Sequence, residues 1–210
     1  MAAQGVQVVG VPASIDNDIW GTNMSIGVDT ALNTIITAVD KLRDTASSHN
    51  RAFIIETMGR NCGYLALMGA LISGAEMVLL PEYEVDVQKV AEMIENSYIR
   101  GKGHAIIIVA EGASIRAGEL AEKLDGMDVG FKTRVTILGH VQRGGQPSAF
   151  DRLLATRLGV RAVELLIQGE TDVMVGLKGR EINMTPLEEV ISQVRTANLA
   201  YYDMLAIVTR

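Results

Sequence analysis

Residues 104–112 read HAIIIVAEG, and this stretch decides the fold class. Ala105–Ala110 are all apolar, over a length typical of one β-strand. Such continuous runs are typical of strands in a parallel sheet that is covered by helices on both faces. The polar Glu111 and the turn-forming Gly112 follow at once. The stretch therefore predicts a buried parallel strand that ends in a polar loop.

Outward from this stretch, apolar runs of strand length alternate with segments that have helical spacing. Strands are predicted at 7–11, 51–56, 77–80, 135–138 and 174–177, and helices at 30–44, 62–73, 87–99, 149–168 and from Thr185 onward. This alternation predicts an α/β fold with mostly parallel sheets sandwiched by helices.

Polar and charged residues follow five of the six predicted strands. They lie at 12–18, 56–63, 81–82, 111–112 and 139–145. In open α/β sheets, ligands bind beyond the carboxyl ends of the strands. The pattern therefore indicates a site assembled from several loops.

Composition excludes some classes of function. The chain has 210 residues, 48% of them hydrophobic and 21% charged, with a formal charge of −6. This composition is typical of a soluble globular protein, and the negative charge gives no general attraction for nucleic acid or an anionic membrane. Met1–Gly10 lacks the features of a signal peptide, and the apolar stretch Tyr64–Leu80 is too interrupted to span a membrane. The single Cys62 excludes an intrachain disulfide, so we expect a reducing compartment, the cytoplasm.

The two aspartates after the first predicted strand allow three interpretations. Asp16 and Asp18 could cap a helix, bind a metal ion, or act as a general base. Ser14 favours the last, because a hydroxyl beside a carboxylate could orient a substrate alcohol.

Two further groups each allow a functional and a structural interpretation. The glycines of Met58–Gly63 could let backbone N–H groups hold an anion, or could serve the turn geometry alone. His140 and Arg143, beside two glycines, likewise suit an anion or a structural role. A second basic group at 98–104, with Arg43, is either a solvated end or a second anion site.

Four motifs, in this order and spacing, resemble the 6-phosphofructokinases of the bacterial type. They are SIDNDIWGT (14–22), ETMGRNCG (56–63), RGKGHAIIIVAEG (100–112) and TRVTILGHVQRGG (133–145). The resemblance covers nearly the whole chain. It implies transfer of a phosphoryl group from ATP to the 1-hydroxyl of fructose 6-phosphate, which gives fructose 1,6-bisphosphate in glycolysis. ATP is then the co-substrate and Mg²⁺ the cofactor.

The resemblance implies two catalytic residues, Asp16 as the general base and Arg60 as a group that stabilises charge during transfer. Ser14 stands where the family commonly has threonine. Asp18 would help to organise the charges around the phosphoryl group, with indirect metal contact as its only metal role. The other implied substrate-binding residues are Arg51, Met58, Gly59, Glu111, Arg134, His140 and Arg143.

Within this set the resemblance implies distinct tasks. Glu111 would bind the sugar hydroxyls, and His140 and Arg143 would bind the 6-phosphate. Arg51 and Arg134 would reach the same phosphate from a neighbouring subunit, which implies a homotetramer.

The resemblance also implies an allosteric site for a nucleoside diphosphate or phosphoenolpyruvate. Its residues would be Arg43, Gly74, Glu76, Arg100, Lys102 and His104. Gly103 stands where a lysine is common in the family, so we expect weaker effector binding. Ala13 replaces a lysine of the pyrophosphate-dependent relatives and favours ATP as the donor.

The implied fold has two lobes, of which the first is incomplete here, because no counterpart of the N-terminal ATP-binding segment is present. Residues 1–25 and 140–182 would belong to the larger ATP-binding lobe. Residues 26–139 and 183–210 would form the smaller lobe that binds fructose 6-phosphate. We expect the isolated chain to be poorly active and prone to associate. The alternatives are a non-catalytic fragment that binds a sugar phosphate or an effector, and a pyrophosphate-dependent relative.

Overall fold

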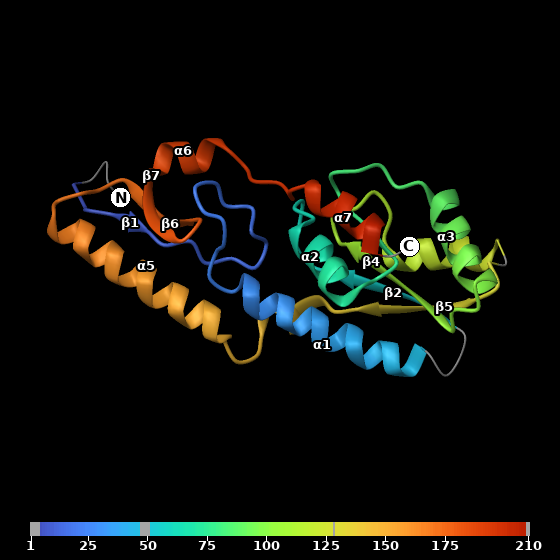
Figure 1. Ribbon diagram of the computed structural model, residues 1–210. Coiled ribbons are helices and arrows are strands. Elements are labelled where there is room, and N and C mark those ends of the chain that lie inside the picture. The colour runs from blue at the N-terminus through green and yellow to red at the C-terminus, as the bar shows by residue number, and fades with distance from the viewer. Residues whose placement is uncertain (1–4, 47–50, 128, 209–210) are drawn as a thin grey trace. The chain divides into compact units, whose positions relative to one another are not determined.

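The chain forms two compact units, each built around its own β-sheet (Figure 1). The computed structural model describes residues 5–46, 51–127 and 129–208. Unit 1 comprises Met1–Ala31 and Gly145–Arg195, and unit 2 comprises Leu32–Gly144 and Thr196–Arg210. Within the described ranges, no helix is both long and apolar enough to cross a membrane.

Unit 2 contains a four-stranded parallel sheet in the order β3–β4–β2–β5. The strands are β2 (Arg51–Thr57), β3 (Met77–Leu79), β4 (His104–Ala110) and β5 (Lys132–Ile137). The central strands β2 and β4 are buried in all but their first residue. Phe53 of β2 lies opposite Ile106 in β4 and Arg134 in β5, which sets the register of the sheet. The buried parallel strand predicted from the apolar run at 105–110 is confirmed.

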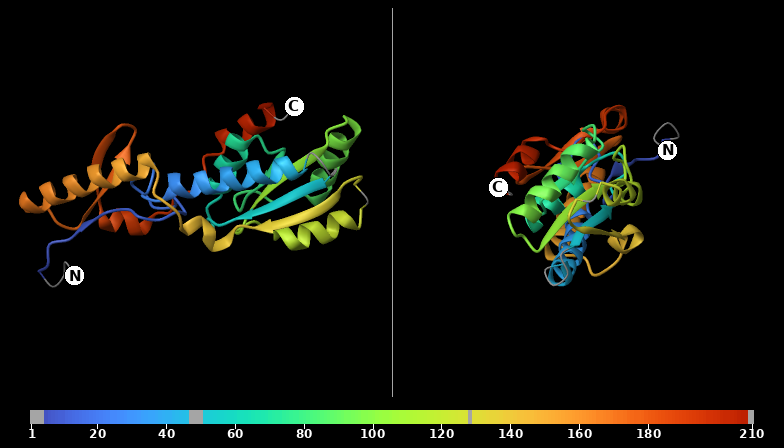
Figure 2. Two further views of the ribbon diagram at one scale, coloured as in Figure 1. Left: turned by 90° about the horizontal axis from the view of Figure 1, so that it is seen from below. Right: turned by 90° about the vertical axis from the view of Figure 1, so that its right-hand side faces the viewer.

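Helices cover both faces of this sheet (Figure 2). They are α1 (Val28–Ala46), α2 (Tyr64–Ser73), α3 (Val87–Ile99) and α4 (Ala117–Asp125), and α7 (Ala200–Val208) packs on α2. α3 and α4 pack on the face that carries Ile54 and Ile107. On the other face, Gly69 of α2 lies against Ile35 of α1 and Ile108 of β4. Successive strand residues point to opposite faces, so two covered faces explain why β4 has no polar position after His104.

Side chains and a glycine determine where these helices begin and end. Asp86 caps α3, because its carboxylate accepts hydrogen bonds from the N–H groups of Gln88 and Lys89. Glu56, at the end of β2, accepts a hydrogen bond of 2.9 Å from the N–H of Ala117 at the start of α4. Gly74 ends α2 in the left-handed conformation, with φ at 65°.

Unit 1 contains a three-stranded sheet in the order β1–β6–β7. Its elements are β1 (Val9–Gly10), β6 (Val173–Lys178), β7 (Glu181–Pro186), α5 (Ala149–Ile167) and α6 (Leu187–Ser192). β1 is parallel to β6, whereas β6 and β7 form an antiparallel hairpin. α5 packs on the sheet through Leu154, Leu158 and Leu165. Its outer side exposes a second apolar set, which includes Leu153 and Ile167.

Several predicted elements are confirmed, and two differ in their bounds. The helix at 87–99 has the predicted bounds, whereas the first strand is shorter than predicted. The last helix does not begin at Thr185, which is buried in β7 and pairs with Met174 of β6. α4, between β4 and β5, was not predicted. Unit 1 includes the pairing of β7 with β6 and extends to Arg195, whereas the predicted lobes, divided after residues 25, 139 and 182, stay a prediction.

Candidate functional site

The loop Met58–Gly63 leaves the carboxyl end of β2 and is fixed by acceptors from three other segments. The N–H of Met58 donates to Oε1 of Gln142 over 2.8 Å. The N–H groups of Gly59 and Arg60 both donate to Oε1 of Glu111, over 3.1 and 2.7 Å. The N–H of Gly63 donates to Oε1 of Glu82 over 2.9 Å.

These bonds decide between the two interpretations of the loop. Four of its N–H groups already donate to side-chain acceptors, and the N–H of Cys62 donates to the carbonyl oxygen of Gly59. An anion at this loop would therefore depend on the exposed side chain of Arg60 rather than on these amides.

The glycines around the loop serve close approach and unusual backbone angles. Gly59 has φ at 146°, and a Cβ there would lie 2.7 Å from the carbonyl oxygen of Cys62. A Cβ on Gly112 would overlap the carbonyl oxygen of Arg60. Arg60 itself has a left-handed φ of 49°, which costs free energy for a non-glycine residue. The hydrogen bonds of the loop hold Arg60 in this conformation.

His140 and Arg143 lie in the 3₁₀ helix η2 (Gly139–Arg143), which directly follows β5. Residues three apart share one side of a 3₁₀ helix, so the two side chains lie side by side. Both are exposed, whereas Gln142 between them is buried. Sequence reasoning missed Gln142 and Glu82. Their positions in polar loops after strands were visible, but a glutamine or glutamate that bonds inward cannot be told from a solvated one by sequence alone.

The predicted substrate residues of unit 2 divide between the two ends of the sheet. Met58, Gly59, Arg60, Glu111, His140 and Arg143 gather at the carboxyl ends of β2, β4 and β5. Arg51 begins β2, and Arg134 lies opposite Phe53. Five residues separate Phe53 from Met58, which is about 17 Å along a strand. Arg51 and Arg134 are therefore not brought to the same end as the other six.

In unit 1, Asp16 lies in a buried turn. Its side chain is 5% exposed, and its N–H donates to Oγ of Ser14 over 3.2 Å. The next residue, Asn17, has φ at 56° and accepts hydrogen bonds from N–H and Oγ of Ser25. The following helix begins only at Val28, so capping by Asp16 or Asp18 is excluded. Half-buried Asp18 accepts at its backbone carbonyl from the N–H of Arg195.

The predicted effector residues lie mostly at the amino ends of the strands of unit 2. Glu76 pairs with Lys102 at 3.4 Å and accepts a hydrogen bond of 2.8 Å from the N–H of Ile106. Arg43 donates to the backbone carbonyl of Ser73 and lies beside Gly74. His104 is the first residue of β4 and pairs with Arg51.

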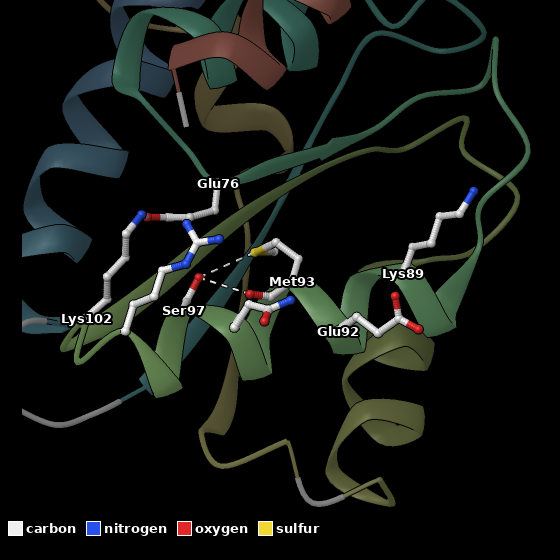
Figure 3. A pocket seen from close by; sticks show the side chains of 8 residues that line it. Glu76, Lys89, Glu92, Met93, Ser97 and Lys102 are labelled. Carbon is white, nitrogen blue, oxygen red and sulfur yellow. Dashed lines mark hydrogen bonds and ion pairs between the residues drawn. The ribbon is translucent and has the colours of Figure 1, made fainter. Parts of the chain in front are cut away.

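A pocket of about 430 Å³ adjoins this group (Figure 3). Three of the predicted effector residues line it, namely Glu76, Arg100 and Lys102. The other lining residues come from α3 and were not predicted: Lys89, Glu92, Met93, Asn96 and Ser97. In Figure 3 the side chains of Glu76 and Lys102 point toward each other across one end of the pocket.

No group of three or more His, Cys, Asp or Glu side chains in the described part of the chain could hold a metal ion. A magnesium ion that is bound mainly through substrate phosphates needs only one or two protein carboxylates. Asp18, half-buried in the segment after β1, could supply one such carboxylate.

Comparison with known proteins agrees with this arrangement. Residues 1–166 match the family described as Phosphofructokinase. The chain is 49% identical over 204 residues to the ATP-dependent 6-phosphofructokinase of Natranaerobius thermophilus, which covers 97% of this chain and 63% of that protein. It is 52% identical over 199 residues to the ATP-dependent 6-phosphofructokinase of Thermotoga neapolitana, which covers 95% of this chain and 62% of that protein. It therefore spans less than two thirds of the length of these relatives.

Solved structures agree as well. The structure of phosphofructokinase from Saccharomyces cerevisiae matches 98% of this chain and 29% of that one, at a TM-score of 0.82 and 33% identity. The pyrophosphate-dependent phosphofructokinase from Marinobacter aquaeolei matches 95% of this chain and 57% of that one, at a TM-score of 0.85 and 24% identity, and shows the fold alone. With the four motifs placed as the loops of an α/β fold and this match over most of its length, the chain belongs to the phosphofructokinase family.

Proposed function

We propose that this chain serves the transfer of the γ-phosphoryl group of ATP to the 1-hydroxyl of fructose 6-phosphate. The observation that carries the proposal is the gathering of six predicted substrate residues at one end of the parallel sheet of unit 2. It is supported by about 50% identity to proteins named ATP-dependent 6-phosphofructokinase. Ala13 further favours ATP over pyrophosphate as the donor.

Asp16 is the proposed general base. A carboxylate in a buried, fixed turn can accept the proton of the 1-hydroxyl without first reorganising. Ser14 accepts a hydrogen bond at Oγ from the N–H of Asp16, which orients the turn. Its hydroxyl is also proposed to orient the substrate alcohol. Asp18 would add negative charge for a magnesium ion bound to the nucleotide, and Mg²⁺ supplies neutralisation of phosphate charge when it is bound.

Arg60 is the proposed stabiliser of the transferring group. Phosphoryl transfer depends mainly on positioning and on charge stabilisation, so an arginine held in a fixed backbone conformation suits the task. Glu111 fixes that conformation through Oε1, which leaves Oε2 for a sugar hydroxyl. This double use of one carboxylate connects sugar binding to the position of Arg60.

His140 and Arg143 are the proposed ligands of the 6-phosphate. Arg51 and Arg134 would bind a phosphate on another copy of the chain. Arg134 lies opposite Phe53, whose backbone is about 17 Å from Met58 along the strand, and this separation supports that division. The complete site would then require a second copy of the chain, and the resemblance implies that the copies form a homotetramer. The apolar outer side of α5, with Leu153 and Ile167 exposed, supports association as well.

The pocket beside Glu76, Arg100 and Lys102 is the proposed allosteric site. Lys89 adds a third cation to its lining, which suits a nucleoside diphosphate or phosphoenolpyruvate. The single cysteine, Cys62, is buried and compatible with the cytoplasm as the compartment.

The deciding experiment is a coupled assay of fructose 1,6-bisphosphate formation by the 210-residue chain from ATP, Mg²⁺ and fructose 6-phosphate, with Asp16→Asn as the control. Loss of a positioned general base is expected to lower the rate by about 10²–10⁴-fold. Titration calorimetry with fructose 6-phosphate separates binding from transfer. Binding without turnover would favour a sugar-phosphate-binding fragment. The absence of both binding and turnover would contradict the proposal for this chain.

A further inference from the structure

Gln142 makes a contact that joins two parts of the candidate site. It lies between His140 and Arg143 in η2, and only 1% of its surface is exposed. Its Oε1 accepts the hydrogen bond from the N–H of Met58 across 84 residues of sequence. Its Nε2 is buried and has no hydrogen-bond partner within the described residues.

This arrangement is unfavourable for stability. A buried donor without an acceptor loses its hydration and gains nothing in return. An apolar side chain of the same length would fill the position without that loss. What glutamine provides and methionine does not is an acceptor for the N–H of Met58. Glutamine at this position therefore provides a bond that fixes the loop, at a cost to the free energy of folding.

The bond from Gln142 complements the one from Glu111. Gln142 holds the loop at Met58 from the side of β5, and Glu111 holds it at Gly59 and Arg60 from the side of β4. Both neighbours of β2 in the sheet thus contribute one acceptor each. Without Gln142, the loop would keep its bonds to Glu111 and Glu82 but would have no side-chain acceptor at Met58, so this end of the loop could move relative to η2.

We infer that Gln142 is a positioning residue that holds the loop of Arg60 at a fixed distance from His140 and Arg143. The inference rests on the proposed function, in which the phosphate of the sugar is bound at η2 and the transferring group at Arg60. A sugar whose 6-phosphate is bound at η2 and which also contacts Met58, Gly59 and Glu111 requires a constant spacing between η2 and the loop. A substitution at Gln142 should therefore weaken substrate binding without unfolding the chain.

The test compares Gln142→Met with the unsubstituted chain in three measurements: thermal unfolding, amide hydrogen exchange of the peptide that contains Met58, and calorimetric titration with fructose 6-phosphate. We expect an unchanged or higher melting temperature. Exchange at Met58–Arg60 should be about fivefold faster, which corresponds to a net hydrogen-bond contribution of about 1 kcal/mol. The dissociation constant for fructose 6-phosphate should rise about three- to tenfold.

Gln88→Met is the matched control, because Gln88 is exposed at the start of α3 and its side chain takes no part in the site. Exchange at Met58–Arg60 that does not change would overturn the inference, as would a loss of affinity that merely follows a loss of stability. If the unsubstituted chain does not bind fructose 6-phosphate, the proposed function fails for this chain while the exchange result still decides the role of Gln142. If Gln142→Met does not fold, Gln142→Glu takes its place, because glutamate retains an acceptor for the N–H of Met58. This variant is expected to keep the slow exchange at Met58. Fast exchange there would count against the inference.

Discussion

Gly112→Ala tests the close packing of the Met58–Gly63 loop against the end of β4. The new Cβ would lie well under 3.0 Å from the carbonyl oxygen of Arg60, and both this oxygen and its carbon are backbone atoms that no rotamer change can move away. The loop would have to shift by roughly 1 Å or more to regain ordinary contact. The overlap is expected to cost about 1–3 kcal/mol.

The shift would also lengthen the hydrogen bonds that Glu111 and Gln142 accept from the loop. Each of the three lost bonds adds about 1 kcal/mol, so the total loss of unfolding free energy is roughly 4–6 kcal/mol. For a chain of this size we expect a fall in melting temperature of about 8–24 °C.

Differential scanning calorimetry measures the effect, with Gly118→Ala as the matched control. Gly118 is exposed in α4 and a Cβ there would meet no atom within 4 Å, so alanine should raise stability by about 0.5–1 kcal/mol. If Gly112→Ala has the same melting temperature as the unsubstituted chain or as Gly118→Ala, the close approach of Arg60 to Gly112 does not constrain residue 112 and the reasoning is refuted.

Three further outcomes are expected. Asp151, buried in unit 1, accepts hydrogen bonds from Gly27 and Thr30, so Asp151→Asn should lower the unfolding free energy by about 2–4 kcal/mol in urea titrations, and an unchanged midpoint would contradict this. Burial and the neighbouring Tyr83 raise the pKa of Tyr202 above 10.0, so the stability that its neutral form contributes is complete below pH 10 and is lost as the pH rises through the raised value. The melting temperature of Tyr202→Phe should therefore fall less between pH 9 and 12 than that of the unsubstituted chain. Equal falls would refute the assignment. Arg100→Ala should weaken ADP binding at the proposed allosteric pocket about tenfold in calorimetry while leaving fructose 6-phosphate binding unchanged, and undiminished ADP binding would place the effector elsewhere.

The parts of the fold that were predictable from sequence are those with a strong local pattern. The apolar run of β4 and the helical spacing of α3 each lie within one contiguous segment, so each can be recognised without knowing its tertiary partners. Asp86, which caps α3, directly precedes the helix. β7 was mistaken for the start of a helix because its strand conformation comes from pairing with β6, which residues 181–186 do not reveal alone.

The candidate site was predictable in its exposed, charged residues and not in its supports. Arg60, His140 and Arg143 belong to recognisable motifs, and the structure places them at one end of one sheet. The tasks of Gln142 and Glu82 depend on which backbone N–H lies opposite each side chain. That is set by the register between strands far apart in sequence. Catalytic and binding roles of the motif residues stay predictions.

The loop that presents Arg60 has a consequence for how the family could diversify. Its amide groups are committed to Gln142, Glu111 and Glu82, so the turn keeps its shape whichever side chain it presents. Recognition of an anion is then left to side chains that project from this frame, such as Arg60, His140 and Arg143. Evolution can exchange these one at a time for new anion preferences, because the side chains that hold the turn are not the ones proposed to contact the anion.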